Sequence, residues 1–180
     1  MIEPGIGLGL YKLTFTNKTA VPNQTGTDTA GAVLYPIGFE YGVLDWLGCG
    51  GKFNYSNYIE DSTGKANGAS TRGIDFEIFV RAHALRTKRI DLFAGLDFGY
   101  SNIKFDLNDG SVGKAAGSNF SFNLNSRFYF GDRWGMHLFY NFDSYNYPKG
   151  TFEDVFGNSL SYSLHLKSFL LLGAGLQFKL

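Results

Sequence analysis

The side chains best equipped for acid–base chemistry or metal binding are the three histidines, His83, His137 and His165. Imidazole serves as a general base in catalysis and as a zinc ligand. The three histidines come from separate parts of the chain, and no Ser or Asp stands at an obvious triad spacing from them. We therefore expect hydrogen-bonded structural histidines, with a catalytic or metal-binding role as the alternative.

Three short motifs resemble ligand-binding sequences without completing them. GIGLG at 5–9 lacks the dinucleotide-binding spacing and leads into a strand. GCGGK at 48–52 lacks the first glycine of a phosphate loop, and Phe53 stands where Ser or Thr is needed. DLNDG at 106–110 is one residue short of a calcium-loop start and favours a turn. The sequence therefore predicts no cofactor, no metal and no catalytic site.

The composition narrows the class of protein. The 180 residues suit one domain spanning 1–180, and 16 basic against 16 acidic residues give no bias toward nucleic acid. Charged residues make up 18% and aromatic residues 17%, with 24 glycines, which favours an all-β protein. The sequence contains no apolar run of 18 residues, which excludes a spanning helix, and its single cysteine, Cys49, excludes an internal disulfide.

Alternation of polar and apolar residues is the dominant pattern, as in RGIDFEIFVRAHAL at 72–85. A period of two indicates a strand, because successive side chains leave the backbone on opposite faces. Eight such segments are expected near 4–15, 33–45, 48–59, 72–85, 90–105, 118–130, 135–147 and 164–179. Tight connections at 45–48, 86–89 and 131–134 alternate with long polar ones at 16–32, 60–71, 106–117 and 148–163. The order predicts an antiparallel up-and-down sheet.

The predicted strands exceed the usual mode of about 5–6 residues and are long enough to cross a bilayer obliquely, which takes roughly 9–11. A sheet of eight such strands is expected to close, because open edges are hazardous in water and excluded in lipid. The fold class is therefore a closed eight-stranded antiparallel transmembrane β-barrel.

One face of the predicted strands is free of charge and rich in Phe, Tyr, Leu and Ile, whereas the other carries glycines and charges of both signs. An eight-stranded barrel has room for little more than its own inward side chains, so the bulky apolar set would overfill it. We therefore expect the apolar set to face lipid and the mixed set to fill the interior. Trp46, Trp134 and Phe178 lie near the short-turn end and fit an aromatic belt.

The interior set predicts a hydrogen-bonded polar network: Glu40, Lys52, Asp75, Glu77, Arg81, Asp97, Arg127, Asp143 and Lys167. The expected pairs are Glu40 with Lys52 directly opposite, Arg81 with Asp97, and Arg127 with Asp143. A packed plug is the favoured interpretation, and a polar conduit or gate is the alternative.

The first strand is less regular than the others. Ile6, Leu8 and Leu10 share one parity, whereas Tyr11, Leu13 and Phe15 share the other. A β-bulge near Leu10–Tyr11 would bring both sets to one face, and a misassigned face is the other possibility.

The stretch NSRFYFGDRWGMHLFYNF at 125–142 resembles a hairpin of small outer-membrane β-barrels, and GIGLGLYKLTF and SFLLLGAGLQFKL look like their first and last strands. The chain thus resembles the OmpA/OmpX-like eight-stranded barrels of Gram-negative bacteria. The resemblance implies a mature protein of the outer membrane, its signal peptide removed, with short turns in the periplasm and long loops outside. The family's C-terminal insertion signal ends in an aromatic residue, whereas this chain ends Phe178-Lys179-Leu180. Lipid-modifying barrels of the deacylase type carry a His-x-Ser arrangement that this sequence lacks.

The expected function is non-enzymatic: a structural membrane component, or a module that adheres to or binds a partner through its extracellular loops. The alternatives are a narrow channel for small or hydrophobic solutes, as in OmpW-like barrels, and then a lipid-modifying enzyme. The expected partners are outer-membrane lipid, lipopolysaccharide and a protein partner, but not nucleic acid. Candidate contacts in the loop at 146–163 are Phe152, Val155, Phe156 and Tyr162.

Overall fold

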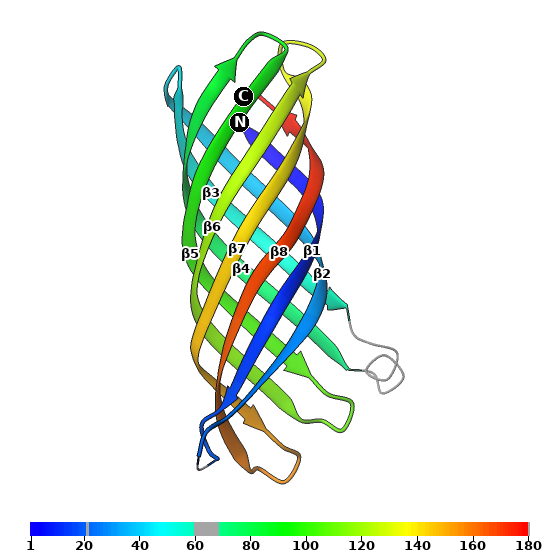
Figure 1. The fold of residues 1–180 in the computed structure, drawn as a ribbon. Helices are drawn as coiled ribbons and strands as arrows, with labels where there is room; N and C mark the ends of the chain where they lie inside the picture. The colour runs from blue at the N-terminus through cyan, green and yellow to red at the C-terminus, as the bar shows by residue number, and fades with distance from the viewer. Residues whose placement is uncertain (21, 60–68, 180) are drawn as a thin grey trace.

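The computed structural model describes residues 1–20, 22–59 and 69–179 and contains eight antiparallel strands. These are β1 (Ile2–Asn17), β2 (Gln24–Leu44), β3 (Leu47–Ile59), β4 (Ser70–Arg86), β5 (Ile90–Asp106), β6 (Val112–Tyr129), β7 (Trp134–Glu153) and β8 (Ser159–Phe178). Each strand pairs with the next along the chain, and β1 pairs with β8, so the sheet closes into a barrel (Figure 1). The expected fold class is confirmed.

Both termini lie at the end of the barrel that carries the short turns, which we call the turn end (Figure 1). The N-terminal ammonium donates a hydrogen bond to the carbonyl of Glu40 at 2.8 Å. At the opposite end β1, β3, β5 and β7 finish and β2, β4, β6 and β8 begin, and we call this end the mouth. Among the described residues, no helix is long and apolar enough to cross a membrane.

The strands continue well into the segments expected to be long connections. β1 runs to Asn17 and β2 begins at Gln24, β5 and β6 enclose 107–111, and β7 and β8 enclose 154–158. The fourth expected connection, 60–71, lies largely outside the described residues. Three of the four expected long loops are therefore mostly hairpins, in which backbone groups of the two strands pair. This pairing satisfies backbone N–H and C=O groups that would otherwise bond only to water.

Two hairpin tips show why these segments turn sharply. At the β5–β6 tip the Leu107 amide donates to the Ser111 carbonyl, and Gly110 has a φ of 88°, a left-handed conformation that favours glycine. At the β7–β8 tip Gly157 has a φ of 79°. There Asp154 accepts hydrogen bonds from the Asn158 side chain and from two backbone amides, which lowers the pKa of this exposed carboxyl below its ordinary value.

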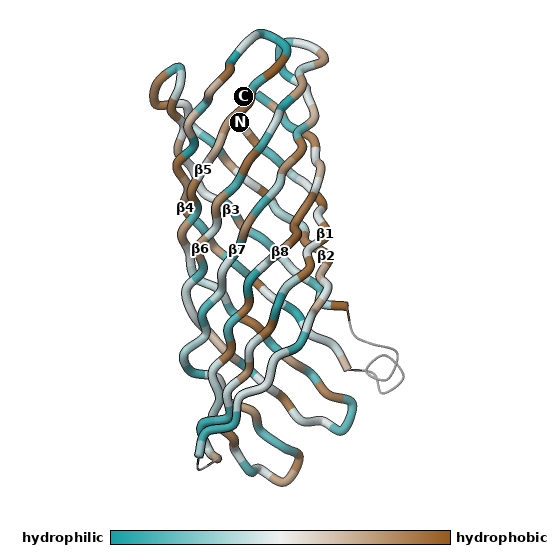
Figure 2. Tube along the Cα trace, viewed as in Figure 1, coloured by the Kyte–Doolittle hydropathy of each residue, from teal (hydrophilic) through white to brown (hydrophobic). Residues whose placement is uncertain are grey.

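The outer surface of the barrel is apolar over its central part. Hydrophobic and hydrophilic residues alternate along the strands (Figure 2), and the exposed members are the large apolar ones. Ile78 is 71% exposed and Phe98 53%, whereas Glu77 is 6% exposed and Arg127 is fully buried. The expected orientation, apolar side chains outward, is confirmed, and a continuous apolar surface of this kind is typical of contact with hydrocarbon.

The aromatic residues at the turn end also lie where the sequence placed them. Trp46 is 57% and Trp134 is 58% exposed, and the Trp134 ring packs against Phe178 with ring centroids 4.7 Å apart. Indole rings at one edge of an apolar surface are typical of a membrane interface.

A bulge sits near Leu10–Tyr11, but its extra residue is in β8. Leu10 pairs with Leu170 and Tyr11 pairs with Ser168, which leaves Phe169 as the additional residue. β1 therefore keeps one parity throughout, and Tyr11 points inward at 1% exposure. Beyond the bulge β8 changes face, so Leu166 is buried inside and Lys167 is exposed outside. The expected inward position of Lys167 and outward position of Leu166 were wrong for this reason.

We predict that a charge placed on the lipid-facing surface destabilises the barrel. Ile78→Arg puts a guanidinium in the middle of the apolar outer face of β4 and should lower the free energy of unfolding by about 2–4 kcal/mol. Urea-induced unfolding in lipid vesicles, followed by tryptophan fluorescence, measures this loss. Val155→Arg at the exposed β7–β8 tip is the matched control and should change little. Equal losses for both variants would contradict the membrane-facing assignment.

Candidate functional site in the barrel interior

The interior of the barrel is divided into two zones. The half toward the turn end is filled by charged and amide side chains, whereas the half toward the mouth is lined by aromatic and aliphatic ones. The sequence predicted a polar filling throughout, so this expectation holds for one half only. The apolar half arises because β1, β7 and β8 keep placing Tyr and Leu on their inward face near the mouth.

Two arginines organise the zone at the turn end. Arg127 donates to Glu3 at 2.6 Å and to Asp91 at 2.9 Å, and it also pairs with Glu40. Arg81 contacts Glu3 at 2.5 Å and Glu40 at 2.8 Å. We call these five residues, together with His83, the arginine cluster. Since Glu3, Glu40 and Asp91 come from β1, β2 and β5, the cluster ties together strands from across the barrel.

His83 completes the cluster. Its Nδ1 lies 2.6 Å from Asp91, and its Nε2 lies 3.2 Å from Glu40. Both ring nitrogens are thus engaged by carboxylates that also bind Arg127, which accounts for His83 as a structural residue.

Two phenylalanines separate the arginine cluster from the barrel wall. The Arg81 guanidinium carbon lies 3.8 Å from the centroid of Phe79, and that of Arg127 lies 4.0 Å from the centroid of Phe93. A guanidinium attracts the negative face of an aromatic ring, and this attraction strengthens when water is excluded. The rings therefore hold both cations in place while excluding water.

A second layer is built on Lys52. The Lys52 ammonium lies 2.5 Å from Glu77 and 2.6 Å from Asp97. Asn119 donates to Glu77 and Asn123 donates to Asp97, both at 2.6 Å. Each charge is thus paired and hydrogen-bonded, and these contacts offset the free energy that is lost when a charge is removed from water.

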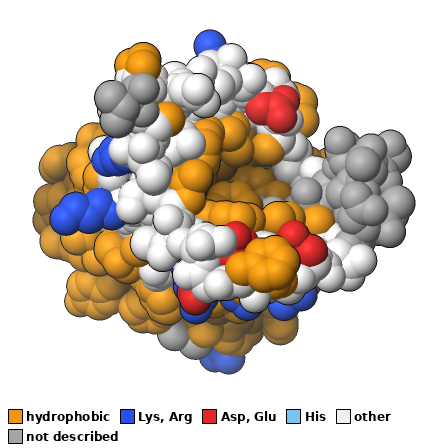
Figure 3. Space-filling view, turned by 90° about the horizontal axis from the view of Figure 1, so that it is seen from below, with side chains coloured by type: hydrophobic (Ala, Val, Ile, Leu, Met, Phe, Trp, Pro, Cys, Tyr) orange, Lys and Arg blue, Asp and Glu red, His pale blue; other side chains and the backbone are white. Residues whose placement is uncertain are grey.

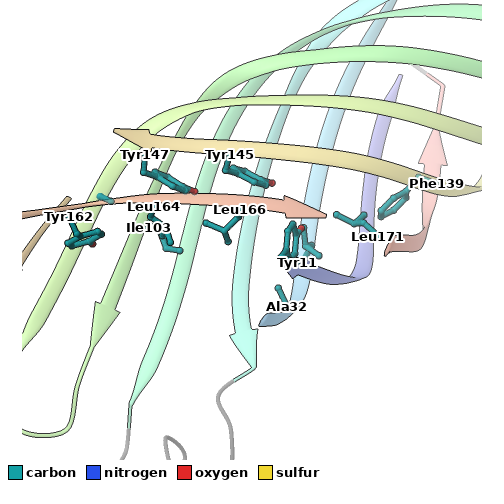
Figure 4. Packing of buried hydrophobic residues seen from close by; sticks show 12 residues of the cluster. Tyr11, Ala32, Ile103, Phe139, Tyr145, Tyr147, Tyr162, Leu164, Leu166 and Leu171 are labelled. Atoms are coloured by element: carbon teal, nitrogen blue, oxygen red, sulfur yellow. The ribbon is translucent and has the colours of Figure 1, made fainter. Parts of the chain in front are cut away.

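A third layer around Asp75 joins the two zones. Asp75 accepts hydrogen bonds from Ser101, from Asn54 at 3.0 Å and from the Tyr145 hydroxyl at 3.3 Å. The Ser101 and Tyr147 hydroxyls lie 2.7 Å apart. The hydroxyls of Tyr145 and Tyr147 thus meet this polar layer. Their rings belong to the cluster of buried apolar residues, which also includes Leu164 and Leu166 (Figure 4).

Little free space remains among the polar layers. A cavity of about 40 Å³ lies between them, lined among others by Lys52, Asn54, Asp143 and Phe139. This holds about three water molecules. Together with the arginine cluster, the layers form a plug, which agrees with the packed interior expected from the sequence.

The individual ion pairs differ from the expected ones. Lys52 pairs across the strands with Gly38 rather than Glu40. The β2–β3 turn is centred between Asp45 and Trp46 rather than on Trp46, and a bulge between Gly42 and Leu44 shifts the register further. Arg81 reaches Glu40 rather than Asp97. Arg127 is opposite His137 on β7, whereas Asp143 is opposite Ser121 and accepts its hydroxyl at 2.5 Å. All three expected pairs were wrong.

Two carboxylates of the arginine cluster, Glu3 and Asp91, were missed by the sequence reasoning. Both lie on the inward parity of their strands, Glu3 with Gly5 and Gly7 and Asp91 with Phe93. Parity alone could have found them. Their partner could not be predicted, because Arg127 reaches across the barrel rather than to a neighbouring strand.

The apolar zone opens to the mouth as a hollow that we call the vestibule. Its volume is about 410 Å³. It is lined by eight residues: Leu13, Phe15, Phe105, Leu107, Phe152, Leu160, Tyr162 and Leu164. Seen from the mouth, hydrophobic side chains cover the hollow and acidic ones lie around its rim (Figure 3). A pocket of this size and lining suits the apolar part of a small ligand.

One residue of the vestibule lining carries a buried polar atom. Tyr162 is only 3% exposed, and its hydroxyl finds no hydrogen-bond partner among the described residues. Its ring lies over Gly150, where an added Cβ would come within 2.4 Å of the ring, and it packs against Phe15 with centroids 5.2 Å apart. The hydroxyl itself is buried behind the ring, so the surface that Tyr162 adds to the vestibule is apolar.

The candidate loop contacts separate into two groups. Phe152 and Tyr162 lie in β7 and β8 and face the vestibule. Val155 and Phe156 lie on the β7–β8 tip and are 51% and 86% exposed. Only the second group is available to a partner that touches the tips.

The remaining histidines provide little for catalysis. His137 is buried beside Phe139 with ring centroids 5.7 Å apart. His165 lies 3.4 Å from the Ser144 hydroxyl, a contact the sequence spacing did not predict. In the described part of the chain no carboxylate bonds to His165, and no group of three or more His, Cys, Asp or Glu side chains is placed to hold a metal ion.

We predict that Arg127 is the residue on which the stability of the plug depends most. Arg127→Leu leaves Glu3, Glu40 and Asp91 with too few cations and should lower the free energy of unfolding by about 3–5 kcal/mol. Urea-induced unfolding in lipid vesicles measures the loss. Arg133→Leu in the exposed β6–β7 turn is the control and should lie within about 0.5 kcal/mol of the original protein. A similar small change for Arg127→Leu would show that the arginine cluster is not what stabilises the plug.

No protein-family model matches the sequence, and no curated protein matches it. Solved structures do share the fold. Neisserial surface protein A is 10% identical, with 97% of each chain covered and a TM-score of 0.51. The outer membrane protein OprG from Pseudomonas aeruginosa is 12% identical, with 99% of this chain and 95% of that chain covered and a TM-score of 0.56. This chain therefore has the fold of the small outer-membrane β-barrels that its sequence resembles.

Proposed function

We propose that the protein is a non-enzymatic binding module of the bacterial outer membrane, which takes the apolar part of an amphipathic small molecule into its vestibule from outside. The observation that carries this proposal is the open, apolar vestibule of about 410 Å³ above a plug of paired charges. Replacement of water on such a lining by a hydrocarbon group is favourable, because it removes apolar surface from water.

The chemistry of the lining defines the ligand class further. Seven of the eight lining side chains are hydrocarbon, and the eighth, Tyr162, has its hydroxyl buried away from the hollow. A matching ligand carries an alkyl or aromatic body that fills the hollow and a polar end that stays at the mouth. Polar side chains of the hairpins around the mouth then face the ligand's solvated end.

The plug favours binding over transport. A solute passing beyond the vestibule would have to displace Asp75, the Lys52 layer and the arginine cluster in turn, each of which is paired within the barrel. An enzymatic role is less favoured, because the Ser144–His165 contact lacks a carboxylate that orients the imidazole among the described residues.

We predict that binding of an amphipathic probe depends on the vestibule lining. Leu160→Asp should weaken binding of a fluorescent medium-chain fatty acid at least tenfold, because it places a charge among hydrocarbon groups. Tyr162→Phe should leave binding of the fatty acid unchanged, because the Tyr162 hydroxyl is buried away from the hollow. Fluorescence titration of the protein in amphipol gives the dissociation constants.

Phe156→Asp is the control for this titration, because Phe156 is 86% exposed on the tip and does not line the vestibule. Its affinity for the probe should match that of the original protein. Binding that is insensitive to Leu160→Asp, or equally sensitive to Phe156→Asp, would overturn the vestibule as the binding site.

We predict that the intact barrel does not conduct ions. In planar bilayers the original protein should show no discrete openings, because paired charges fill the turn-end half of the barrel. Arg127→Ala removes the side chain that joins three carboxylates and should produce openings. Discrete openings of the original protein that change size on Lys52→Gln would instead support the channel alternative.

A further inference from the structure

A row of cations lies on the outer surface of the barrel near the mouth. Arg72 on β4, Lys104 on β5, Lys114 on β6 and Lys149 on β7 are all exposed. We call them the cationic row. Arg72 pairs across the strands with Lys104, and Lys104 pairs with Lys114. Lys149 pairs with Ala116, the next outward position of β6 after Lys114. The four cations line a shallow hollow of about 520 Å³.

Their arrangement leaves three of the four cations without an ion pair among the described residues. Like charges directly opposite each other on neighbouring strands destabilise a sheet. Lys104 reaches Asp106 at 2.7 Å, and that pair is largely exposed. The hollow itself is lined by these four cations and by neutral residues, with no carboxylate in its described lining. The net charge of this patch therefore attracts an anion.

The position of the cationic row along the barrel axis indicates which kind of anion it binds. Arg72 is two residues from Ile74, and the outward face of β4 continues with Phe76, Ile78 and Val80, all exposed and apolar. On β5, Tyr100 occupies the corresponding edge before Lys104. The row thus lies immediately beyond the surface that hydrocarbon covers. Aliphatic stems of Lys and Arg at such a boundary lie along apolar surface while their charges meet lipid headgroups.

A second pair repeats this pattern elsewhere around the barrel. Lys12 on β1 is directly opposite Lys167 on β8, and both are exposed. They lie beside Phe169, the apolar residue that the bulge turns outward at 54% exposure. Asp28 lines the same hollow, so this pair is partly neutralised. The cationic row remains the stronger anion site of the two.

We infer that the cationic row binds the phosphate groups of a phosphorylated glycolipid in the outer leaflet, with the lipid's acyl chains lying against Ile74, Phe76 and their outward neighbours. A phosphate offers several acceptor oxygens to several cations at once, and Arg72 binds it in a bidentate way. This site is separate from the vestibule and independent of what the vestibule holds. It assigns to the protein a lipid-binding outer surface on strands β4–β7.

The test uses purified lipopolysaccharide as the probe, titrated in non-ionic detergent and followed by microscale thermophoresis. The triple variant Lys104→Gln, Lys114→Gln, Lys149→Gln should weaken binding at least tenfold. The matched control, Lys88→Gln, Arg89→Gln, Arg133→Gln, removes three exposed cations from the turn end and should leave binding unchanged. A shift in gel migration between heated and unheated samples verifies that each variant is folded. If the triple variant does not fold, the single variant Lys114→Gln is used in its place.

Three further arms separate the possible sources of the anion. Dephosphorylated lipopolysaccharide should bind the original protein as weakly as lipopolysaccharide binds the triple variant. Inorganic phosphate at millimolar concentration should not displace the lipid, and added salt should weaken binding to the original protein more than to the triple variant. Equal losses in the turn-end control, undiminished binding of the dephosphorylated lipid, or displacement by inorganic phosphate or an acidic peptide would each overturn the assignment.

Discussion

The charged interior of the barrel depends on one arrangement, in which Arg127 and Arg81 are held among Glu3, Glu40 and Asp91. A barrel wall surrounded by hydrocarbon leaves these groups no access to bulk water, so each charge must find its partners inside. The arginine forks supply several hydrogen bonds each, and Phe79 and Phe93 cover their flat faces. Because the cluster joins β1, β2, β4, β5 and β6, it also fixes these strands relative to one another.

The vestibule follows from the same constraint. Once the turn-end half of the barrel is closed by paired charges, the mouth half can only be a blind hollow. Its lining of Leu, Phe and Tyr is the reverse of the polar lumen expected of a conduit. The barrel therefore presents apolar surface in two places, on its outside and in the vestibule at its mouth. The cationic row and the hairpins mark the boundary between these two environments.

The fold was largely predictable, and the site was predictable only in part. The alternation of polar and apolar residues predicted the eight strands. The large volume of the apolar side chains predicted that they face outward, because a narrow barrel has no room for them inside. The pairs of Glu40, Arg81 and Arg127 were not predictable, since bulges such as the one between Gly42 and Leu44 shift register by a residue. The vestibule could not be predicted, because the extra residue Phe169 reverses the inward face of β8 toward the mouth and the sequence of β1 is compatible with either face.

The sequence by itself determined which side chains share a face of each strand, because that depends only on the period of two in an extended backbone. It thereby determined the barrel, its lipid-facing surface and the presence of buried charge of both signs. Only the tertiary structure decided which inward residues meet, because Arg127 and Glu3 are joined across the lumen by closure and strand register rather than by spacing in the chain. Closure likewise gathered Leu13, Phe105, Phe152 and Leu160 from four strands into one vestibule.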